Sequence, residues 1–418
     1  MHRLRAVPIA VLVALATVLT GLRLRRTSSA PPVTARPGGN SDGGAAPASD
    51  LAAAPLKALD AGVPDHAARM LHGDRHHTHR AHGHGPREAH LTWKYTTGGP
   101  IEAQVVTSPD EKTLYVASLD GTLTALGRDG QKRWSVSLGD RIYGTPAVAD
   151  DGTLYVGSDS KFFSAVSPSG VVLWKLETGA DADTSAAFAK DGKIIFSSGR
   201  KLYAVRPGGD VAWRFQAKGK IFSAPAIADD GTILFGAQDH GAYAVSPAGA
   251  LVWWTDLGAD VDCAPAIGDD GAFFFGSDAP QGEVVRLDSK GDIVWRAAVG
   301  GFVRGALSVG RDGDLLAGVY GPTPRTVRIS ATDGLIRGSF SIQGTGAKEF
   351  GVHGGALEDD DGTLFFGAQD DAAYAVDRTG KTRWRFATQG DVDAPFTLLG
   401  DGSLVVPSDD GNVYLLSP

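Results

Sequence analysis

The chain has 418 residues, 42% of them hydrophobic, which suits one large domain or two to three ordinary ones with a buried core. Its 56 glycines favour many turns over long helices, and its one cysteine, Cys263, excludes an intramolecular disulfide, a cysteine-based zinc cluster and a c-type haem. Residues 1–90 carry eleven basic and six acidic side chains, so 91–418 carry 29 basic and 42 acidic ones. The resulting net charge of −13 argues against nucleic-acid binding, which needs a basic surface.

The first 26 residues predict an export signal or a membrane anchor. Arg3 and Arg5 precede the apolar run 6–22, and this order is typical of a bacterial export signal. The run is near the lower limit of about 17 residues for a membrane span, so cleavage and anchoring both remain open. We therefore expect a cell-envelope protein, periplasmic or secreted, or anchored to the membrane by residues 6–22. No cysteine lies near this segment, which excludes a lipoprotein anchor.

Two further segments precede the main body of the chain. Residues 27–65 are rich in Ala, Pro, Gly and Ser, and this composition predicts a flexible linker. Residues 66–90 hold eight of the eleven histidines. Imidazoles bind transition metals, so one interpretation is a metal site. The other, which we favour, is a His-rich lead-in that is structured without metal.

Eight similar units follow in residues 91–418. Their markers are Trp93, Trp134, Trp174, Trp213, Trp253, Trp295, Phe340 and Trp384. The spacing of about 40 to 45 residues, with several short strands in each unit, is typical of a β-propeller. We therefore predict an all-β fold, an eight-bladed β-propeller of four-stranded blades.

One unit illustrates the predicted blade. Strands are expected at 141–148, 153–157, 162–166 and 171–176, because β-branched and aromatic runs alternate there with glycine-containing turns. An Asp-Gly pair recurs at the first turn of the units, as in DDGT at 150–153, 229–232 and 360–363. These glycines are expected to take positive φ in tight turns.

The two ends of the repeat region predict how the ring closes. The last unit, 390–418, supplies only three strands. The missing fourth is expected to be the N-terminal strand 90–95, which carries Trp93. Pairing of the two ends would remove an open sheet edge.

The segments LDGTLTALGRDGQKRW (119–134) and AAYAVDRTGKTRW (372–384) resemble pyrroloquinoline-quinone-type (PQQ-like) propeller repeats. Quinoprotein alcohol dehydrogenases and the propeller lipoprotein of the outer-membrane barrel assembly machine share these repeats, and the resemblance covers 91–418. The lead-in also matches bacterial relatives, at Met70, Asp74, His77, Thr78, Arg80, Gly85 and Pro86. The resemblance implies a disulfide of adjacent cysteines and a calcium site in the quinone enzymes. One cysteine and a single propeller asparagine, Asn412, do not fit these features, so no cofactor is predicted.

One column of the aligned units breaks the apolar pattern. In the innermost strand, nine residues after six of the markers, it holds Tyr143, Asp183, Phe222, Asp262, Arg304 and Asp393. In the two longer units, which are aligned on the first turn instead, it holds Ala103 and His353. Charged side chains at one height around an axis must face water, each other or a ligand. Asp183, Asp262, Arg304, His353 and Asp393 are therefore the candidate ligand-binding residues at the channel mouth. A solvated mouth with salt bridges is the alternative that we favour, and Cys263 is expected to be a packed small side chain.

The sequence thus predicts a non-enzymatic binding or scaffolding propeller of the cell envelope, monomeric, with a protein partner. The alternative is an envelope enzyme, or a small-ligand or metal-binding propeller, that uses the polar column. In the enzymatic case His353 and Asp393 would be the acid–base pair. No catalytic residue and no metal ligand is assigned. A deep pocket lined by the five candidates would favour a ligand or an enzyme, and a channel filled by side chains would favour a scaffold.

Overall fold

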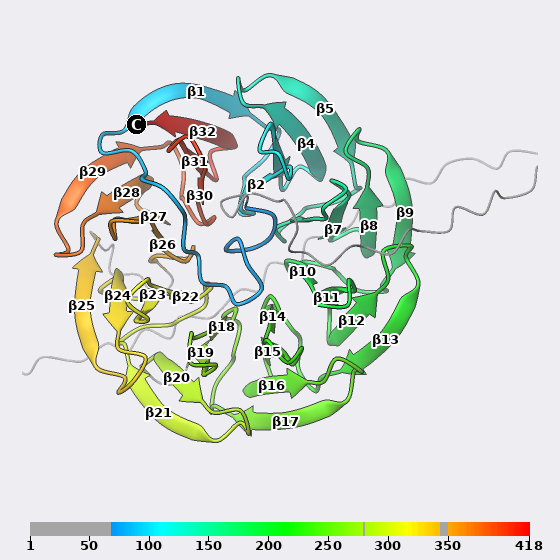
Figure 1. Ribbon diagram of the computed structural model, residues 1–418, viewed down its shortest axis with the longest axis vertical. Helices are drawn as coiled ribbons and strands as arrows, with labels where there is room; N and C mark the ends of the chain where they lie inside the picture. Colours follow the sequence, from blue (N-terminus) through cyan, green and yellow to red (C-terminus); the bar gives the residue numbers. More distant parts are fainter. Residues whose placement is uncertain (1–67, 279–280, 343–349) are drawn as a thin grey trace, which may run out of the picture. The chain divides into compact units, whose positions relative to one another are not determined.

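The structure is a computed structural model that describes residues 68–278, 281–342 and 350–418. Its strands form eight antiparallel sheets of four, arranged as a ring (Figure 1). The predicted eight-bladed propeller is thereby confirmed. The expected signal or anchor at 1–26, the linker at 27–65 and the first two lead-in residues lie outside the described residues. The part of the chain that the structure describes holds no helix able to span a membrane.

The blades follow the chain, and each is numbered here by its order. Blades 1 to 4 contain β2 (Val106–Thr107), β3 (Thr113–Ala117), β4 (Thr122–Gly127), β5 (Lys132–Ser137); β6 (Ala147–Val148), β7 (Leu154–Ser158), β8 (Phe162–Val166), β9 (Val172–Glu177); β10 (Ala187–Phe188), β11 (Ile194–Ser198), β12 (Lys201–Val205), β13 (Val211–Gln216); β14 (Ala226–Ile227), β15 (Ile233–Ala237), β16 (Gly241–Val245) and β17 (Leu251–Asp256). In each blade the first strand is innermost and the fourth is outermost.

The second half of the ring repeats this pattern. Blades 5 to 8 contain β18 (Ala266–Ile267), β19 (Phe273–Ser277), β20 (Glu283–Leu287), β21 (Ile293–Ala298); β22 (Ser308–Val309), β23 (Leu315–Val319), β24 (Arg325–Ile329), β25 (Ile336–Ser341); β26 (Leu357–Glu358), β27 (Leu364–Ala368), β28 (Ala372–Val376), β29 (Thr382–Ala387); β30 (Thr397–Leu398), β31 (Leu404–Pro407), β32 (Asn412–Ser417) and β1 (His90–Thr96). Eight hydrophobic clusters, each shared by two neighbouring blades, form the core.

The innermost strands are much shorter than the sequence predicts. An eight-residue strand was expected at 141–148, but only Ala147–Val148 pairs within its own blade. The preceding backbone bonds to neighbours instead: the amide of Ile142 donates to the Ser118 carbonyl of blade 1, and that of Thr145 donates to Ser185 Oγ of blade 3. Near the axis the blades converge, so these amides find partners across blades rather than along one sheet.

The ring closes as predicted. β1 pairs antiparallel with β32, in a register from His90 opposite Ser417 to Thr96 opposite Asn412. The N-terminal strand is therefore the outermost strand of blade 8, whose other three strands come from the C-terminus.

The marker tryptophans join each blade to the next. Trp174 of β9 donates from Nε1 to the Pro207 carbonyl at 2.8 Å, in the turn before β13. Its ring lies against Gly209 of that turn, where φ is 95° and a Cβ would come within 3.0 Å of the indole. All seven tryptophan markers donate an equivalent hydrogen bond from Nε1, whereas the side chain of Phe340 has no N–H.

The lead-in segment, described from Ala68 to Ala89, runs across the middle of the ring and is drawn in blue in Figure 1. Its carbonyl groups accept hydrogen bonds from the innermost strands of six blades, for example Val148 N to Arg69 O at 2.8 Å and Ile227 N to Arg75 O at 2.8 Å. A buried amide without a partner costs about 1–3 kcal/mol. The lead-in therefore completes the hydrogen bonding of the blades along the axis.

The repeated DDGT turns have two tasks. The second aspartate caps its own turn, as Asp151 does by accepting from Thr153 N at 2.9 Å. The following glycine, Gly152, has φ of 82°, and the other Asp-Gly turns share this conformation, which confirms the predicted turn chemistry. The first aspartate binds the lead-in: Asp229 pairs with Arg75 at 2.8 Å, and Asp150 pairs with Arg69. The turns thus lie on the same face of the ring as the lead-in.

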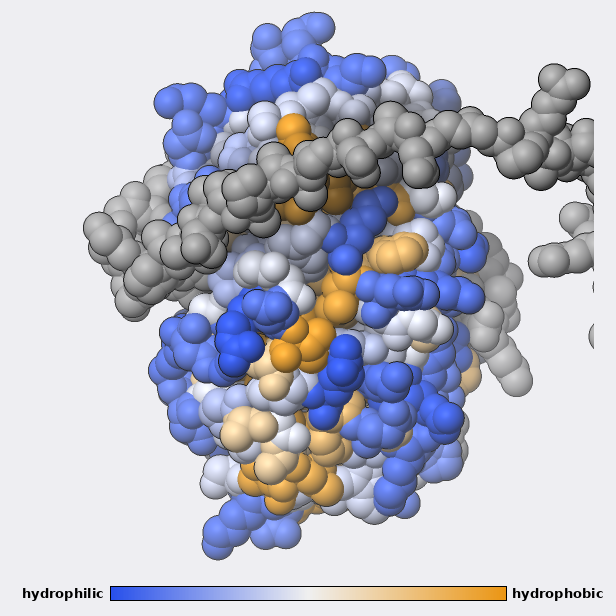
Figure 2. Space-filling model, turned by 90° about the vertical axis from the view of Figure 1, so that its right-hand side faces the viewer, coloured by the Kyte–Doolittle hydropathy of each residue, from blue (hydrophilic) through white to orange (hydrophobic). Residues whose placement is uncertain are grey.

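Exposed aliphatic side chains gather at the outer rim. Of ten exposed large hydrophobic residues in the described chain, nine stand at or just before the start of an outermost strand: Leu91, Val171, Leu173, Leu251, Val252, Ile293, Val294, Leu335 and Ile336. Figure 2 shows hydrophobic side chains between hydrophilic ones on the β9 and β13 side of the ring.

We predict that Trp174→Phe lowers the free energy of unfolding by about 1 kcal/mol, because the aromatic packing stays and one hydrogen bond is lost. Urea unfolding followed by circular dichroism measures this change. Trp254→Phe is the matched control, because Trp254 Nε1 is buried without a hydrogen-bond partner and its replacement removes no bond. Equal losses in the two variants would show that the Nε1 bond does not join the blades.

Candidate functional site

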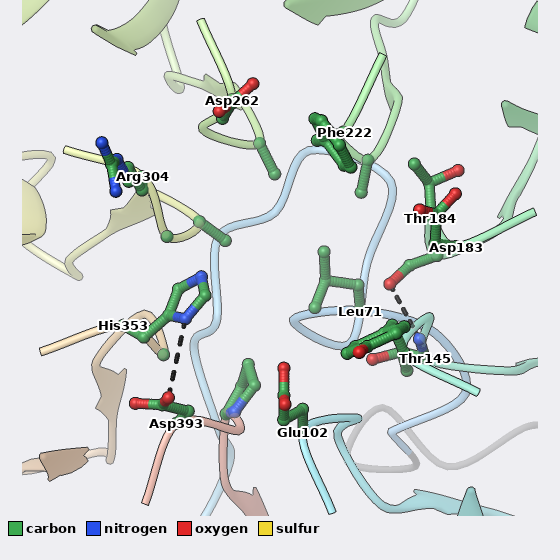
Figure 3. Close-up of a pocket in the computed structure, with 18 of the residues that line it drawn as sticks. Leu71, Glu102, Thr145, Asp183, Thr184, Phe222, Asp262, Arg304, His353 and Asp393 are labelled. Carbon is green, nitrogen blue, oxygen red and sulfur yellow. Dashed lines mark hydrogen bonds and ion pairs between the residues drawn. The ribbon is translucent and has the colours of Figure 1, made fainter. Parts of the chain in front are cut away.

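The channel mouth opposite the lead-in forms a cavity of about 540 Å³, which we call the cup (Figure 3). Every blade contributes to its wall. Among the lining residues are Glu102, Tyr143, Asp183, Phe222, Asp262, Arg304, His353 and Asp393, in the order of blades 1 to 8. Most of them lie at the equivalent height just before the innermost strands, so the eightfold repeat turns a column of the sequence into a ring.

The cup has a closed floor. Leu71 of the lead-in lies in the middle of the opening in Figure 3 and packs against Ala224 and Ala264 of two innermost segments. Leu71 is 7% exposed. The cup is therefore a blind pocket, polar at its walls and apolar at its base, and not a through channel.

All five candidate residues from the sequence line the cup. His353 Nδ1 lies 4.0 Å from Asp393 Oδ2, the neighbour expected for it. Asp262 accepts a hydrogen bond from Gln238 at 3.2 Å, and Arg304 pairs with Asp278 at 2.8 Å. Asp278 lies in the loop that follows β19 of blade 5, so this ion pair joins blade 5 to the segment before β22.

In blade 1 the alignment of the column was wrong by one residue. Ala103 was placed in the polar column, but it is buried in the core, and Glu102 lines the cup instead. The strand register gives the reason, because Val106–Thr107 is equivalent to Ala147–Val148, which makes Glu102 the counterpart of Tyr143. The polar column therefore contains one more carboxylate than the sequence predicts.

Carboxylates outnumber bases among the described lining residues. Six carboxylates face three permanently charged bases there. Two groups of three aspartates, whose oxygens lie within 4.8 Å of one another, lie at the wall: Asp159, Asp181 and Asp183, which all line the cup, and Asp391, Asp393 and Asp409, of which Asp393 does. Arg141 and Lys220 lie at the first group, at 2.9 Å from Asp159 and 3.7 Å from Asp183. At the second group, Asp393 lies 4.0 Å from the imidazole of His353 and accepts a hydrogen bond from Gln369 at 2.9 Å.

The crowding shows in the proton affinity of these groups. Burial, with the charge of Asp393, raises the pKa of Glu102 to about 7. Burial and the neighbouring carboxylates raise the pKa of Asp409 to about 8 and that of Asp391 to about 6. Near neutral pH this side of the cup therefore holds protons that a bound cation would displace.

The sequence held a signal for part of this charge. The tripeptide Asp-x-Asp occurs at 181–183, 260–262 and 391–393, each time just before the innermost strand. Its second aspartate belongs to the polar column, and the first was not considered. Asp159 and Asp409 come from the turns after β7 and β31, and only the folded blade brings them to the cup.

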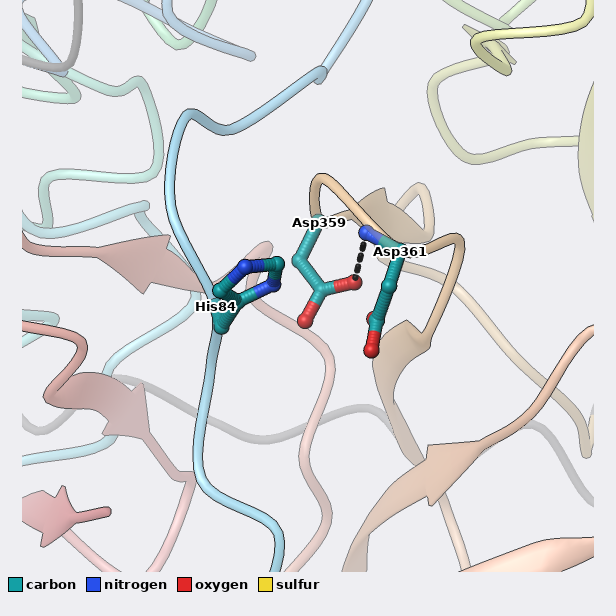
Figure 4. Close-up of side chains that lie close together, drawn as sticks. All are labelled: His84, Asp359 and Asp361. Atoms are coloured by element: carbon teal, nitrogen blue, oxygen red, sulfur yellow. Dashed lines mark hydrogen bonds between the residues drawn. The ribbon is translucent and has the colours of Figure 1, made fainter.

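A third group of acidic residues lies on the lead-in face. His84, Asp359 and Asp361 converge there (Figure 4). Arg87 lies 3.7 Å from Asp359 and pairs closely with Asp361, and the Gly85 amide donates to Asp359 at 3.0 Å. This group therefore fastens the end of the lead-in to blade 7.

The hydroxyl and thiol groups around the cup have structural partners. Thr184 Oγ1 bonds Ser197 Oγ at 2.8 Å, and Ser223 Oγ donates to the Cys263 carbonyl at 2.9 Å. Cys263 is fully buried, and burial raises the pKa of its thiol to about 12. In the described wall the chemistry on offer is charge recognition and proton exchange by the carboxylates, with His353 beside Asp393.

Comparison with known proteins gives the family. The family model described as outer membrane protein assembly factor BamB matches residues 82–207, 163–247 and 238–337, which together span more than half of the chain. The chain belongs to this family of PQQ-like repeat propellers. No curated protein sequence matches the chain significantly.

Solved structures support the same fold. BamB from Moraxella catarrhalis superposes with a TM-score of 0.64 at 17% identity, over 79% of this chain and 100% of that one. A europium-containing methanol dehydrogenase reaches a TM-score of 0.70 at 12% identity, over 85% and 98%. The computationally designed Ika8 protein reaches 0.62 at 14% identity, over 80% and 100%. At these identities the likeness is one of fold.

We predict that the protein loses stability as the pH rises from 6.5 to 8. A carboxyl with a raised pKa is protonated in the native state and ionised in the unfolded state, so stability falls until the pH passes the native pKa. Asp409→Asn should make this decline shallower in urea unfolding at several pH values. Glu88→Gln, which removes an exposed carboxylate of the lead-in, is the control and should leave the slope unchanged. A wild-type profile that is flat or rising over this range would contradict the prediction.

Proposed function

We propose that this protein is a non-enzymatic binding propeller of the cell envelope, which holds a protein partner by a basic segment inserted into the cup. The observation that supports this most directly is the cup itself, a blind, open pocket whose wall carries more carboxylates than bases. Membership of a family described as an outer-membrane assembly factor agrees with a role in protein interaction and with the envelope.

The dimensions of the cup suit one or two side chains. A cavity of about 540 Å³ lies in the range of ordinary ligand sites, and its apolar floor at Leu71 would contact the aliphatic part of a lysine or arginine. Phe222 is 39% exposed at the mouth, with Lys220 Nζ 3.9 Å from its ring centre. An arginine of the partner could replace that lysine over the ring.

A second candidate is a free small cation of the amine class. The depth of the cup favours a free small cation, because all five charged residues predicted from the sequence line one pocket. A small molecule could fill this pocket without being part of a protein. The two candidates share the recognition chemistry, and binding to a peptide or to a free amine separates them.

Quinone-dependent catalysis has less support. A methanol dehydrogenase shares the fold at 12% identity, and this likeness does not extend to a site. The family's quinone enzymes are expected to use a disulfide of adjacent cysteines, and this chain has one cysteine, buried in the core.

The test is binding of a lysine- and arginine-rich peptide of about ten residues to the full chain, measured by calorimetry. We expect Glu102→Gln with Asp393→Asn to weaken binding about tenfold or more, since two carboxylates that meet at the second aspartate group are removed. Binding should release protons near pH 7, because the raised pKa of Glu102 and that of Asp409 fall when a cation binds. Buffers with different ionisation enthalpies reveal this release.

Two controls make the test specific. Glu88→Gln removes a carboxylate that lies outside the cup, and it should bind like the wild type. Peptides in which every basic residue is replaced by glutamine should not bind. Equal affinity of the double variant and the wild type would refute the cup as the site, and binding of free amines but not of the peptide would favour the second candidate.

A further inference from the structure

We propose that the lead-in is an acid-released latch, which closes the floor of the cup at neutral pH and detaches when His72, His77 and His79 take up protons. The inference concerns the floor of the cup and does not depend on which ligand the cup receives. It rests on where the three imidazoles lie and on what surrounds them.

The three rings fill the axis of the propeller beneath the cup. Their residues are 1%, 1% and 3% exposed, in the order His72, His77, His79. The ring of His72 stacks on that of His79 with centroids 4.1 Å apart and planes 6° apart. His77 meets His72 edge-on at 5.9 Å. Three basic groups thus share one buried site without water between the stacked pair.

The hydrogen bonds of the rings fit neutral imidazoles. His77 Nδ1 lies 2.8 Å from the Pro265 carbonyl, and His79 Nε2 lies 3.0 Å from the Phe396 carbonyl, so each ring donates one proton. The other nitrogen of His79 and Nε2 of His72 are buried without a hydrogen-bond partner. Protonation of both rings would stack two cations with centroids 4.1 Å apart in a buried site.

The charged groups near the rings do not offset this. Asp74 and His76 of the lead-in act on them, and the Asp74 carboxylate is already bonded to Thr78 and to the His76 amide. The packed innermost segments present backbone carbonyls to the rings, and Gln104 Oε1 accepts a hydrogen bond from the backbone amide of His72 at 2.8 Å. Glu358 of β26 faces Arg328 instead, at 3.2 Å.

The backbone of the latch holds conformational energy as well. All three histidines have φ between 55° and 59°, in the left-handed region that side chains with a Cβ rarely take. This backbone persists because the carbonyls of the lead-in accept the amides of six innermost strands, including Thr78 O from Val309 N and His79 O from Glu358 N. Once the protonated rings leave their buried positions, the strain in this backbone favours release of the lead-in.

Burial lowers the pKa of all three histidines, for His79 to about 4. A histidine with a lowered native pKa stabilises the docked state fully above its unfolded value of about 6.5, and this contribution declines as the pH falls toward the native pKa. Each such group changes the docking equilibrium by up to about tenfold per pH unit in this window. The three contributions have the same sign, so together they make the dependence of docking on pH steeper than one group could.

Release would change the cup directly. Leu71 adjoins His72, so detachment removes the floor and joins the cup to the cavity of about 430 Å³ on the lead-in side. The carboxylates of the cup act in the opposite direction, because their raised pKa values stabilise the fold at low pH. The latch therefore opens locally while the ring of blades stays closed.

The experiment is amide hydrogen exchange with mass spectrometry on the full chain, with protection factors corrected for the intrinsic rate, at pH 7.5, 6.5, 5.5 and 4.5. We expect the protection of peptides that cover 68–82 to fall more than tenfold between pH 6.5 and 5.5. Peptides from the outer strands β9 and β13 should keep their protection over the same range.

Matched variants test the role of the buried rings. His72→Gln with His79→Gln should remove most of the pH dependence at 68–82, because two of the three fully buried imidazoles, which form the stacked pair, are gone. His82→Gln, which changes an exposed histidine of the same segment, should leave it intact. If the buried double variant does not fold, His79→Phe keeps an aromatic ring in the stack. It should reduce the slope of the protection of 68–82 against pH by the contribution of about one proton.

Three results would overturn the latch. Protection of 68–82 that does not change between pH 7.5 and 4.5 shows that acid does not release it. Protection that is lost together with that of β9 and β13 shows global unfolding instead. If the variant without the buried histidines folds and its protection at 68–82 depends on pH as steeply as that of the control variant, these histidines do not sense the pH.

Discussion

Hydrogen bonding at the axis is the constraint on which this structure depends. The innermost strand of each blade has two residues and pairs with the second strand of the same blade on one side only. The backbone amides on its other side, which point to the axis, need hydrogen-bond acceptors from elsewhere. The lead-in supplies the acceptors for six blades, and its arginines bind the first aspartate of the blade turns. A segment before the repeats is therefore part of the propeller core, and it also makes the cup blind.

The interactions that stabilise the ring and the groups that could bind a ligand lie at different distances from the axis. The hydrophobic clusters and the tryptophan bonds lie between the blades and toward the rim, where they hold the ring together. The axis carries buried imidazoles on one side of Leu71 and crowded carboxylates on the other. Such groups reduce stability, and the cup can contain them because the packing between blades is complete without them.

The sequence predicted the blades, the turns and the ring closure because each depends on a local pattern that recurs eight times. It also brought Asp183, Asp262, Arg304, His353 and Asp393 together, because equivalent positions of a repeat meet at one height. It did not predict the path of the lead-in, which occurs once and bonds through its backbone. Glu102 and Asp409 were missed for related reasons, since one unit has a different length and the other residue reaches the cup from a turn.

The single phenylalanine among the markers makes the ring unequal. At seven joints an indole N–H reaches across to the next blade or to the lead-in, but between blades 6 and 7 Phe340 makes only ring contacts, 5.5 Å from Phe366 and 5.6 Å from Tyr374. Gly380, in the facing turn, has no indole against it. This joint is also linked by two ion pairs, Arg311 with Asp360 and Arg328 with Glu358, so the interactions that hold neighbouring blades together differ around the ring.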